Sequence, residues 1–128
     1  MFTHVTVGTH DLAAARRFYD AVFAALGTDP GVIDAKGRLV YQNGLGRFLV
    51  TRPIDGGAAS AANGGTIGFA APSVEAIHAW HDAGVTQGGT SCEDPPGLRT
   101  LADGRALYLA YLRDPAGNKL CAVHRVNA

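Results

Sequence analysis

The sequence predicts an α+β fold made of two βαβββ modules, and three observations support this prediction. The chain repeats itself without a gap at an offset of 62 residues, which places His4 on Thr66 and Gly27 on Gly89. Each copy has a short apolar strand, a polar cap residue and an amphipathic helix that ends at glycine. Short strand-like segments follow each helix. We therefore expect one domain with helices on one face of mixed or antiparallel sheets, and a site between the two modules.

The first module is predicted over residues 1–53. Its first strand covers residues 2–8, which are rich in β-branched side chains. Asp11 is the predicted N-cap of a helix, and Gly27 is its predicted end. Apolar side chains recur in this helix at spacings of three and four, at Leu12, Ala15, Phe18, Tyr19, Val22, Phe23 and Leu26. Further strands are predicted at residues 32–33, 38–42 and 47–52.

A linker and the second module complete the prediction. Residues 54–65 (IDGGAASAANGG) are small, polar and rich in glycine, which is typical of a connection between modules. The second module, over residues 66–128, begins with a strand at 66–70, and Ser73 caps a helix whose core positions include Trp80. We expect the helix region to end at Gly84 and Gly88-Gly89. Residues 92–100 are predicted as a loop, 107–112 as a strand, 114–118 as a turn and 119–126 as the last strand.

Composition excludes several classes of protein. Eleven basic and eleven acidic side chains give a net charge of zero, and the densest basic group is Arg16-Arg17. Nucleic-acid and anionic-membrane surfaces both need a basic patch, so we expect neither partner. No apolar run approaches the roughly 20 residues that span a bilayer, and the first residues do not resemble a signal peptide. Two cysteines are too few for a disulfide scaffold, which favours the reducing cytoplasm.

Three segments resemble the vicinal oxygen chelate superfamily, which contains glyoxalase I, bleomycin and fosfomycin resistance proteins, and extradiol dioxygenases. They are the opening HVTVGTHDLAAARRFYDAVFAALG, the second-module IGFAAPSVEAIHAWHDAGVTQGG and the ending YLAYLRDPAGNKLCAVH. The resemblance spans essentially the whole chain. It implies two βαβββ modules whose mixed sheets curl round a cleft. It also implies a homodimer and, in many members, one divalent metal in that cleft.

The resemblance also names four equivalent positions from which the family commonly takes its metal ligands. They lie at the start of each module's first strand and in the middle of each module's last strand. In this chain they correspond to His4, Thr66, Leu49 and Cys121, the last two being related by an offset of 72 residues. Only His4 and Cys121 carry metal-binding groups, whereas zinc sites commonly use three or four protein ligands. We therefore expect no metal cofactor; if a divalent metal binds, His4 and Cys121 are its predicted ligands.

The candidate catalytic residues are His4 and Cys121, which we expect to face the same cleft. An imidazole can lower the pKa of a nearby thiol and make it a nucleophile, but most free cysteines are inert, buried side chains, and both interpretations of Cys121 stay open. Arg99 is a candidate clamp for a carboxylate or a solvated loop cation. Tyr108 is a candidate ligand-orienting phenol or a packing residue. The candidate substrate-binding residues are Tyr108, Arg99, Leu49 and Thr66.

Two functional hypotheses follow from these residues. The first is a metal-free protein that binds or acts on a small molecule in the cleft between the modules, similar to the bleomycin-resistance branch. The alternative is a metal-dependent lyase or isomerase that resembles lactoylglutathione lyase and uses His4 and Cys121. The missing imidazole at Thr66 and the missing carboxylate at Leu49 favour the first hypothesis. Fold resemblance does not choose the chemistry, because one scaffold hosts many functions.

Overall fold

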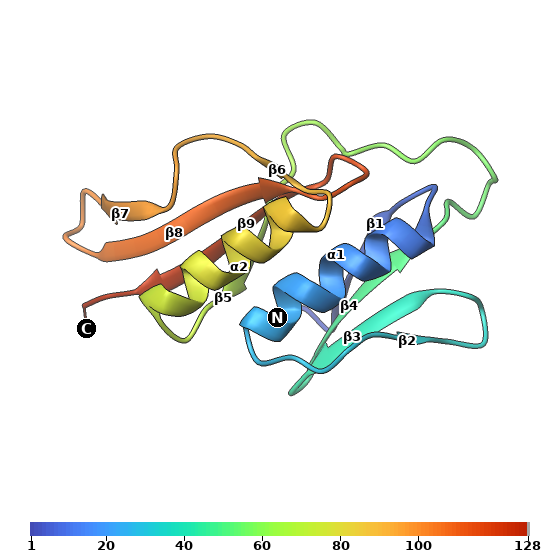
Figure 1. Ribbon diagram of the computed structural model, residues 1–128, viewed down its shortest axis with the longest axis horizontal. Helices are drawn as coiled ribbons and strands as arrows, with labels where there is room; N and C mark the ends of the chain where they lie inside the picture. The colour runs from blue at the N-terminus through green and yellow to red at the C-terminus, as the bar shows by residue number, and fades with distance from the viewer. Residues whose placement is uncertain (128) are drawn as a thin grey trace.

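Two β-sheets lie side by side behind a pair of helices in the computed structural model, which describes residues 1–127 (Figure 1). The first sheet has the order β1-β4-β3-β2 and the second the order β5-β9-β8-β6, with β7 also paired to β8. The first sheet consists of β1 (His4–Gly8), β2 (Val32–Ile33), β3 (Leu39–Asn43) and β4 (Gly46–Thr51). The second consists of β5 (Ile67–Ala70), β6 (Thr90–Ser91), β7 (Gly97–Thr100), β8 (Ala106–Arg113) and β9 (Lys119–Arg125). The mixed α+β fold with two modules is confirmed.

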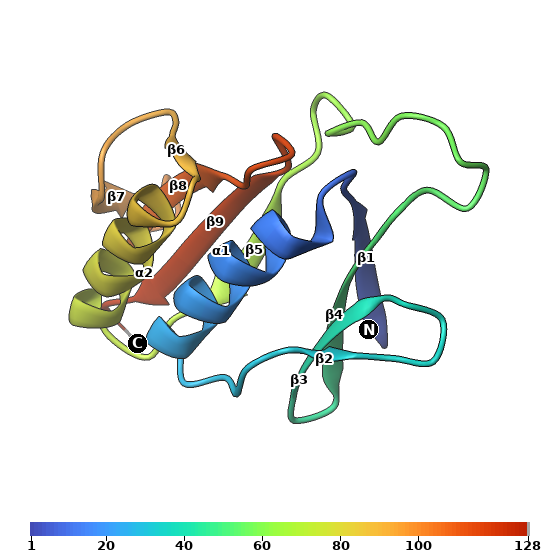
Figure 2. The same ribbon diagram turned by 45° about the vertical axis from the view of Figure 1, so that its right-hand side comes forward.

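The two modules share the same strand register. In each, the first strand pairs in parallel with the last: Val5 lies opposite Phe48, and Ile67 lies opposite Leu120. These pairs are related by the offsets of 62 and 72 residues found in the sequence. The remaining pairs within each sheet are antiparallel. As a result, β1 and β5 are each an edge strand of their sheet (Figure 2).

Helices α1 (Leu12–Ala25) and α2 (Val74–Thr86) run antiparallel on the same side of the molecule (Figures 1 and 2). The Asp11 and Ser73 side chains cap them by accepting hydrogen bonds from the backbone N–H groups of the third helical residues. Gly27, with φ of +85°, follows α1 in the left-handed conformation that favours glycine. No helix among residues 1–127 has the length and apolar character needed to cross a membrane.

Gly84 lies inside α2, so the prediction that it ends the helix is wrong. A Cβ atom on Gly84 would lie 2.3 Å from Leu112 Cδ1 and 3.2 Å from atoms of Phe18 and Val22. Only glycine therefore allows α2 to approach α1 and β8 this closely. Gly88, with φ of +92°, terminates the helix region instead.

Residues 92–100 are not entirely a loop, because β7 pairs antiparallel with β8 from Gly97 onward. The preceding residues 94–96 include two prolines, which favour a loop. For this reason the short strand that follows them was not predicted from the sequence. The linker predicted over residues 54–65 contains no helix or strand. Its Ala59 passes close to Gly8 at the end of β1.

A buried hydrogen-bond network joins the two modules at the turn between β8 and β9. The Tyr19 hydroxyl of α1 donates to Asp114 Oδ2 at 2.6 Å, and Asn118 Nδ2 donates to the Gly8 carbonyl at 3.0 Å and to Asp114 Oδ2 at 2.9 Å. Asp114 and Asn118 are both buried. Around this network the core is continuous from one sheet to the other through both helices.

Candidate functional site

Each sheet has one face toward the helices and one face away from them, because successive strand side chains alternate. In β4 and β9 the side chains of Phe48 and Leu120 belong to the core beneath the helices. The residues that follow them, Leu49 and Cys121, therefore point to the opposite face, as does His4 at the start of β1. Leu49 and Cys121 are nevertheless only 2% and 6% exposed. The two repeat-related positions are thus covered by other parts of the chain.

A pocket of about 400 Å³ lies where the inner edges of the two sheets meet. Its lining comes from β1 and the residues before it, the end of α1, the β3–β4 hairpin and β5. The rings of Phe23, Phe48 and Phe69 form its aromatic wall, with centroids 5.0–5.4 Å apart and nearly perpendicular planes. Phe69 is half-buried, so its ring is accessible from the pocket. Both modules contribute to this wall, which makes the pocket an inter-module feature.

A row of polar side chains borders the pocket across three neighbouring strands. Register places His4 of β1 beside Arg47 of β4, and Arg47 beside Gln42 of β3. All three line the pocket. His4 Nδ1 shares a hydrogen bond of 2.9 Å with Thr3 Oγ1. We refer to His4, Arg47 and Gln42 as the polar row.

The Tyr41 ring packs against Phe23 of the aromatic wall, with centroids 4.8 Å apart. Its hydroxyl donates to Asp20 Oδ1 at 2.6 Å, and the same carboxylate oxygen accepts the Gly31 N–H at 2.9 Å. Burial is the main cause that raises the pKa of Tyr41 far above its ordinary value, and the hydrogen bond to Asp20 adds to it. The phenol therefore stays protonated and engaged, so Tyr41 presents its ring, not its hydroxyl, to the pocket.

Cys121 lies outside this pocket, on the face of β9 away from the helices. Burial raises the pKa of its thiol to about 11. Tyr111 lies opposite it on β8, and the Lys119 ammonium sits 5.2 Å from the Tyr111 ring centroid while it pairs with Glu93. At neutral pH the Cys121 thiol is consequently protonated and a weak nucleophile.

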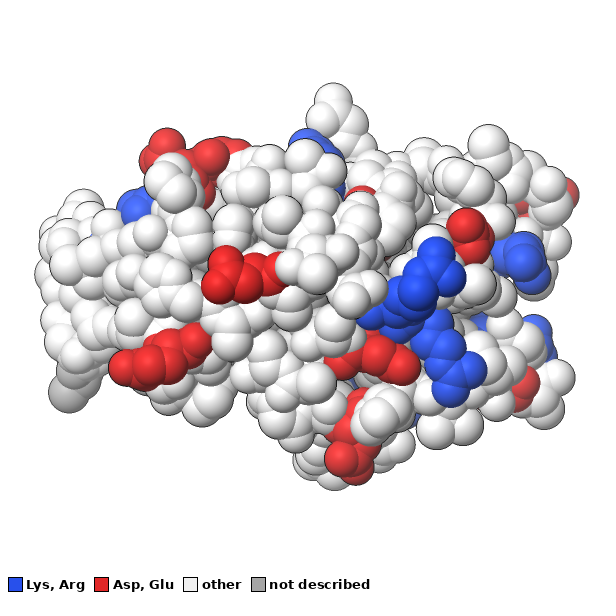
Figure 3. Space-filling view, viewed as in Figure 1, with Lys and Arg blue, Asp and Glu red and all other residues white. Residues whose placement is uncertain are grey.

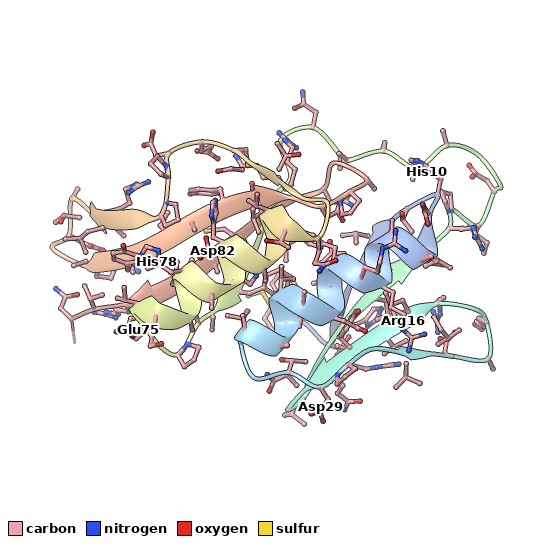
Figure 4. The ribbon with its side chains drawn as sticks, viewed as in Figure 1. His10, Arg16, Asp29, Glu75, His78 and Asp82 are labelled. Carbon is pink, nitrogen blue, oxygen red and sulfur yellow. The ribbon has the colours of Figure 1, made fainter. Side chains whose placement is uncertain are left out.

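The other predicted site residues lie apart from one another. Tyr108 is on the helix-covered face of β8, where its hydroxyl shares a 2.7 Å hydrogen bond with His78 Nε2. His78 projects from the side of α2 away from α1 (Figure 4). Arg99 lies on β7, with Asp94 Oδ2 at 3.8 Å, and Thr66 is an exposed residue just before β5. Of the six predicted site residues, His4 alone lines the pocket.

The chemistry of the four family ligand positions does not fit a metal. Leu49 offers only hydrocarbon, Thr66 carries a hydroxyl, and the Cys121 thiol is held protonated. Within residues 1–127 no three His, Cys, Asp or Glu side chains come together as a group that could hold an ion. No metal-dependent step can therefore be derived from the side chains at these positions.

Apart from His4, the residues that build the pocket are not among the site residues predicted from the sequence. The sequence indicates Phe23 only as an apolar position of its helix. The repeat offsets relate Arg47 to Lys119 but do not set the register between strands, so only the structure places Arg47 beside both His4 and Gln42. On the face that carries the helices, charged side chains lie in small separate groups of both signs (Figure 3).

Comparison with known proteins agrees with this architecture. The sequence model of the Glyoxalase/Bleomycin resistance protein/Dioxygenase superfamily matches residues 1–122. A crystal structure of a glyoxalase/bleomycin resistance protein from Albidiferax ferrireducens T118 is 52% identical, with a TM-score of 0.92 over 97% of this chain and 98% of that chain. No curated protein matches the sequence.

Two more distant structures share the fold alone. A glyoxalase-related enzyme from Fulvimarina pelagi is 18% identical, with a TM-score of 0.70 over 96% of this chain and 86% of that chain. A lactoylglutathione lyase from Agrobacterium tumefaciens is 22% identical, with a TM-score of 0.63 over 96% of this chain and 92% of that chain.

Proposed function

The chain belongs to the glyoxalase/bleomycin resistance protein/dioxygenase superfamily, and on this premise we propose that it binds a small molecule in the pocket between its two modules, without a metal. The pocket itself carries the proposal. Its volume of about 400 Å³ falls within the range of small-molecule sites, roughly 300–1,000 Å³. It also combines an aromatic wall with a few polar groups, which is the usual composition of such sites.

The absence of a metal is part of the proposal and has its own test. The four family ligand positions hold one imidazole, one protonated thiol, one hydroxyl and one hydrocarbon side chain. The protein is reconstituted with Zn, Ni, Fe and Mn and then desalted. We expect it to retain less than about 0.1 metal ion per chain, because the site has too few ligands. The measurement is plasma mass spectrometry on untagged protein. A value near one metal ion per chain would contradict this part of the proposal.

The alternative function is a metal-dependent lyase or isomerase that uses His4 and Cys121. It has less support, because burial raises the pKa of the Cys121 thiol to about 11 and Cys121 does not line the pocket that contains His4. We expect Cys121→Ala to leave small-molecule binding unchanged. Robust isomerisation of a glutathione hemithioacetal, lost in Cys121→Ala, would favour the alternative instead.

Gly68 provides a direct test of pocket binding. It lines the pocket from β5, and a Cβ atom added there meets nothing within 4 Å. By register Gly68 lies opposite Cys121, on the face away from the helices that also carries His4. Gly68→Trp should therefore extend over this side of the pocket and narrow it, whereas Gly68→Ala should leave it open. Fluorescence titration with the neutral aromatic probe N-phenyl-1-naphthylamine should show saturable binding to the wild type and to Gly68→Ala. Binding to Gly68→Trp should be at least about tenfold weaker.

Gly68→Ala and Gly68→Trp differ only in the size of the side chain at one position, so the alanine variant controls for general effects of substitution. Circular dichroism tests whether each variant is folded. Equal probe binding by all three proteins would show that the probe binds elsewhere. No saturable binding to the wild type would remove the support for a small-molecule pocket. Either result contradicts the proposed function.

The proposal further includes a cytoplasmic homodimer. The low number of cysteines, two, supports a reducing compartment. Several large apolar side chains are exposed, among them Phe2, Val32 and Leu45, and the chain has no net charge to oppose self-association. Light scattering during size-exclusion chromatography should give twice the mass of 13.3 kDa. A monomer at all concentrations would contradict this part.

A further inference from the structure

We infer that the pocket selects a flat aromatic molecule that carries one carboxylate, and that Arg47 binds this carboxylate. The inference rests on the proposed function, since it names the class of ligand for the same pocket. It follows from the distribution of aromatic and charged groups around the pocket, which have no other assigned role.

The aromatic preference follows from the wall. Phe23, Phe48 and Phe69 are arranged edge to face, an arrangement that suits a further aromatic ring better than a bulky aliphatic group. Phe2, at the mouth, is largely exposed and offers another ring. Phe23 and Phe48 are only 5% and 6% exposed, so a bound flat ring would contact mainly the half-buried Phe69 and the exposed Phe2.

The preference for an anion follows from charge. The residues that line the pocket include Arg47 and His4 but no aspartate or glutamate. Among residues 1–127, no carboxylate lies within 4.0 Å of the Arg47 guanidinium, unlike Arg38 and Arg99, which are paired. Arg47 is exposed at the rim of the pocket, so its unpaired guanidinium is free to bind a carboxylate through two parallel hydrogen bonds.

The polar row makes the site specific for a single small anionic group. Adjacent strands are about 4.8 Å apart, so His4 and Gln42 lie close enough on either side of Arg47 to contact the same carboxylate. One guanidinium balances one negative charge, which favours a monocarboxylate over a phosphate dianion. Asp29 and Asp34 border a neighbouring hollow beyond Arg47 and would repel a second anionic group there.

The ligand must reach both the aromatic wall and the polar row. Arg47 and Phe48 are consecutive residues of β4 and point to opposite faces. Gly46, which precedes them, also lines the pocket, and the space beside its Cα is open: an added Cβ would have a single neighbour, at 3.7 Å. A molecule bound across Gly46 at the start of β4 can therefore place its ring on one side and its carboxylate on the other.

Isothermal titration calorimetry with three compounds tests this inference. 2-Naphthoate has both the ring and the charge, 2-naphthamide has the ring alone, and cyclohexanecarboxylate has the charge alone. We expect 2-naphthoate to bind at least about tenfold more tightly than either of the others, as a charge-assisted hydrogen bond predicts. Arg47→Gln should remove this advantage over the amide and leave the affinity for 2-naphthamide unchanged.

Arg52→Gln is the matched control, because Arg52 is exposed, lies just after the same strand and does not line the pocket. It should bind all three compounds as the wild type does. Equal affinities for naphthoate and naphthamide, or an Arg47→Gln variant with unchanged naphthoate affinity, would overturn the inferred ligand class. The proposed function would then still stand if Gly68→Trp abolished binding of the neutral probe, so the two failures are distinguishable.

Discussion

Removal of one hydroxyl group from the junction of the two modules should measurably destabilise the protein. The Asp114 carboxylate accepts four hydrogen bonds, from the Tyr19 hydroxyl, the Asn118 side chain and the backbone N–H groups of Ala116 and Asn118. No Lys or Arg within the described residues pairs with it. In Tyr19→Phe, a buried acceptor loses its shortest hydrogen bond, at 2.6 Å, while the ring keeps its packing.

The expected magnitude follows from the type of hydrogen bond that is lost. Hydrogen bonds to charged groups contribute about 1.5–3 kcal/mol, and the ring of phenylalanine leaves no cavity. We therefore expect the free energy of unfolding of Tyr19→Phe to be lower by about 2 kcal/mol near neutral pH. Tyr108→Phe is the matched control. It removes a hydroxyl whose partner, His78, is exposed, so the loss should be below about 0.5 kcal/mol.

The pH dependence of this difference is a second, sharper expectation. Burial, followed by the charge of Asp114, raises the pKa of Tyr19 well above its ordinary value of 10.0. Below pH 10 the phenol is protonated in both the folded and unfolded states, and the full difference is present. Above pH 10 only the unfolded chain releases this proton, so the wild type loses up to about 1.4 kcal/mol per pH unit. Tyr19→Phe lacks this loss, and the gap between the two proteins should narrow.

Urea denaturation monitored by circular dichroism at pH 7, 9, 10 and 10.5 measures these quantities. Tyr41 is present in both proteins, and its burial keeps the folded-state phenol protonated in both, so its contribution largely cancels in the difference. A loss below about 0.5 kcal/mol at pH 7 would show that the hydrogen bond contributes no more than an exposed one. A gap that stayed constant or widened above pH 10 would refute the protonation argument.

Three further predictions concern packing, capping and thiol reactivity. Gly84→Ala should lower the free energy of unfolding by about 1–3 kcal/mol in urea denaturation, because the new Cβ would lie 2.3 Å from Leu112 Cδ1. An unchanged midpoint of the urea transition would show that the helices can move apart without loss of stability. Asp11→Ala should lower the same quantity by about 1 kcal/mol, since it removes the N-cap of α1, and a change near zero would contradict this. At pH 7.5 iodoacetamide should modify the half-buried Cys92 well before Cys121, because the pKa of about 11 keeps Cys121 a thiol. Peptide mass spectrometry reports the order of labelling, and faster labelling of Cys121 would contradict the prediction.

The fold was largely predictable because the two modules repeat the same pattern in the sequence. The gapless repeat aligns Val5 with Ile67, and the offset of the last strands aligns Phe48 with Leu120. The structure pairs Val5 with Phe48 and Ile67 with Leu120, so the aligned residues occupy equivalent places in the two sheets. Caps and glycine ends also followed from local chemistry. Gly84 was misinterpreted because a glycine that stops a helix and a glycine that permits close helix packing look the same in sequence.

The candidate site was predictable only in part. His4 lines the pocket, as its position at the start of β1 suggested. The aromatic wall could not be predicted, because Phe23, Phe48 and Phe69 come from three elements whose rings meet only after both sheets are in place. The high pKa of Cys121 likewise depends on residues that cover it from other strands and loops.

The position of β9 has a consequence for how the chain is made. β9 follows every other element in the sequence, yet it lies inside its sheet, between β5 and β8. The first module can complete its sheet once residue 51 has left the ribosome, whereas β5 has no partner strand until β9 emerges. During that interval the strand edges of β5 and β8 that later pair with β9 are open to other chains. The second half of synthesis is therefore the stage at which this protein is most exposed to misassembly.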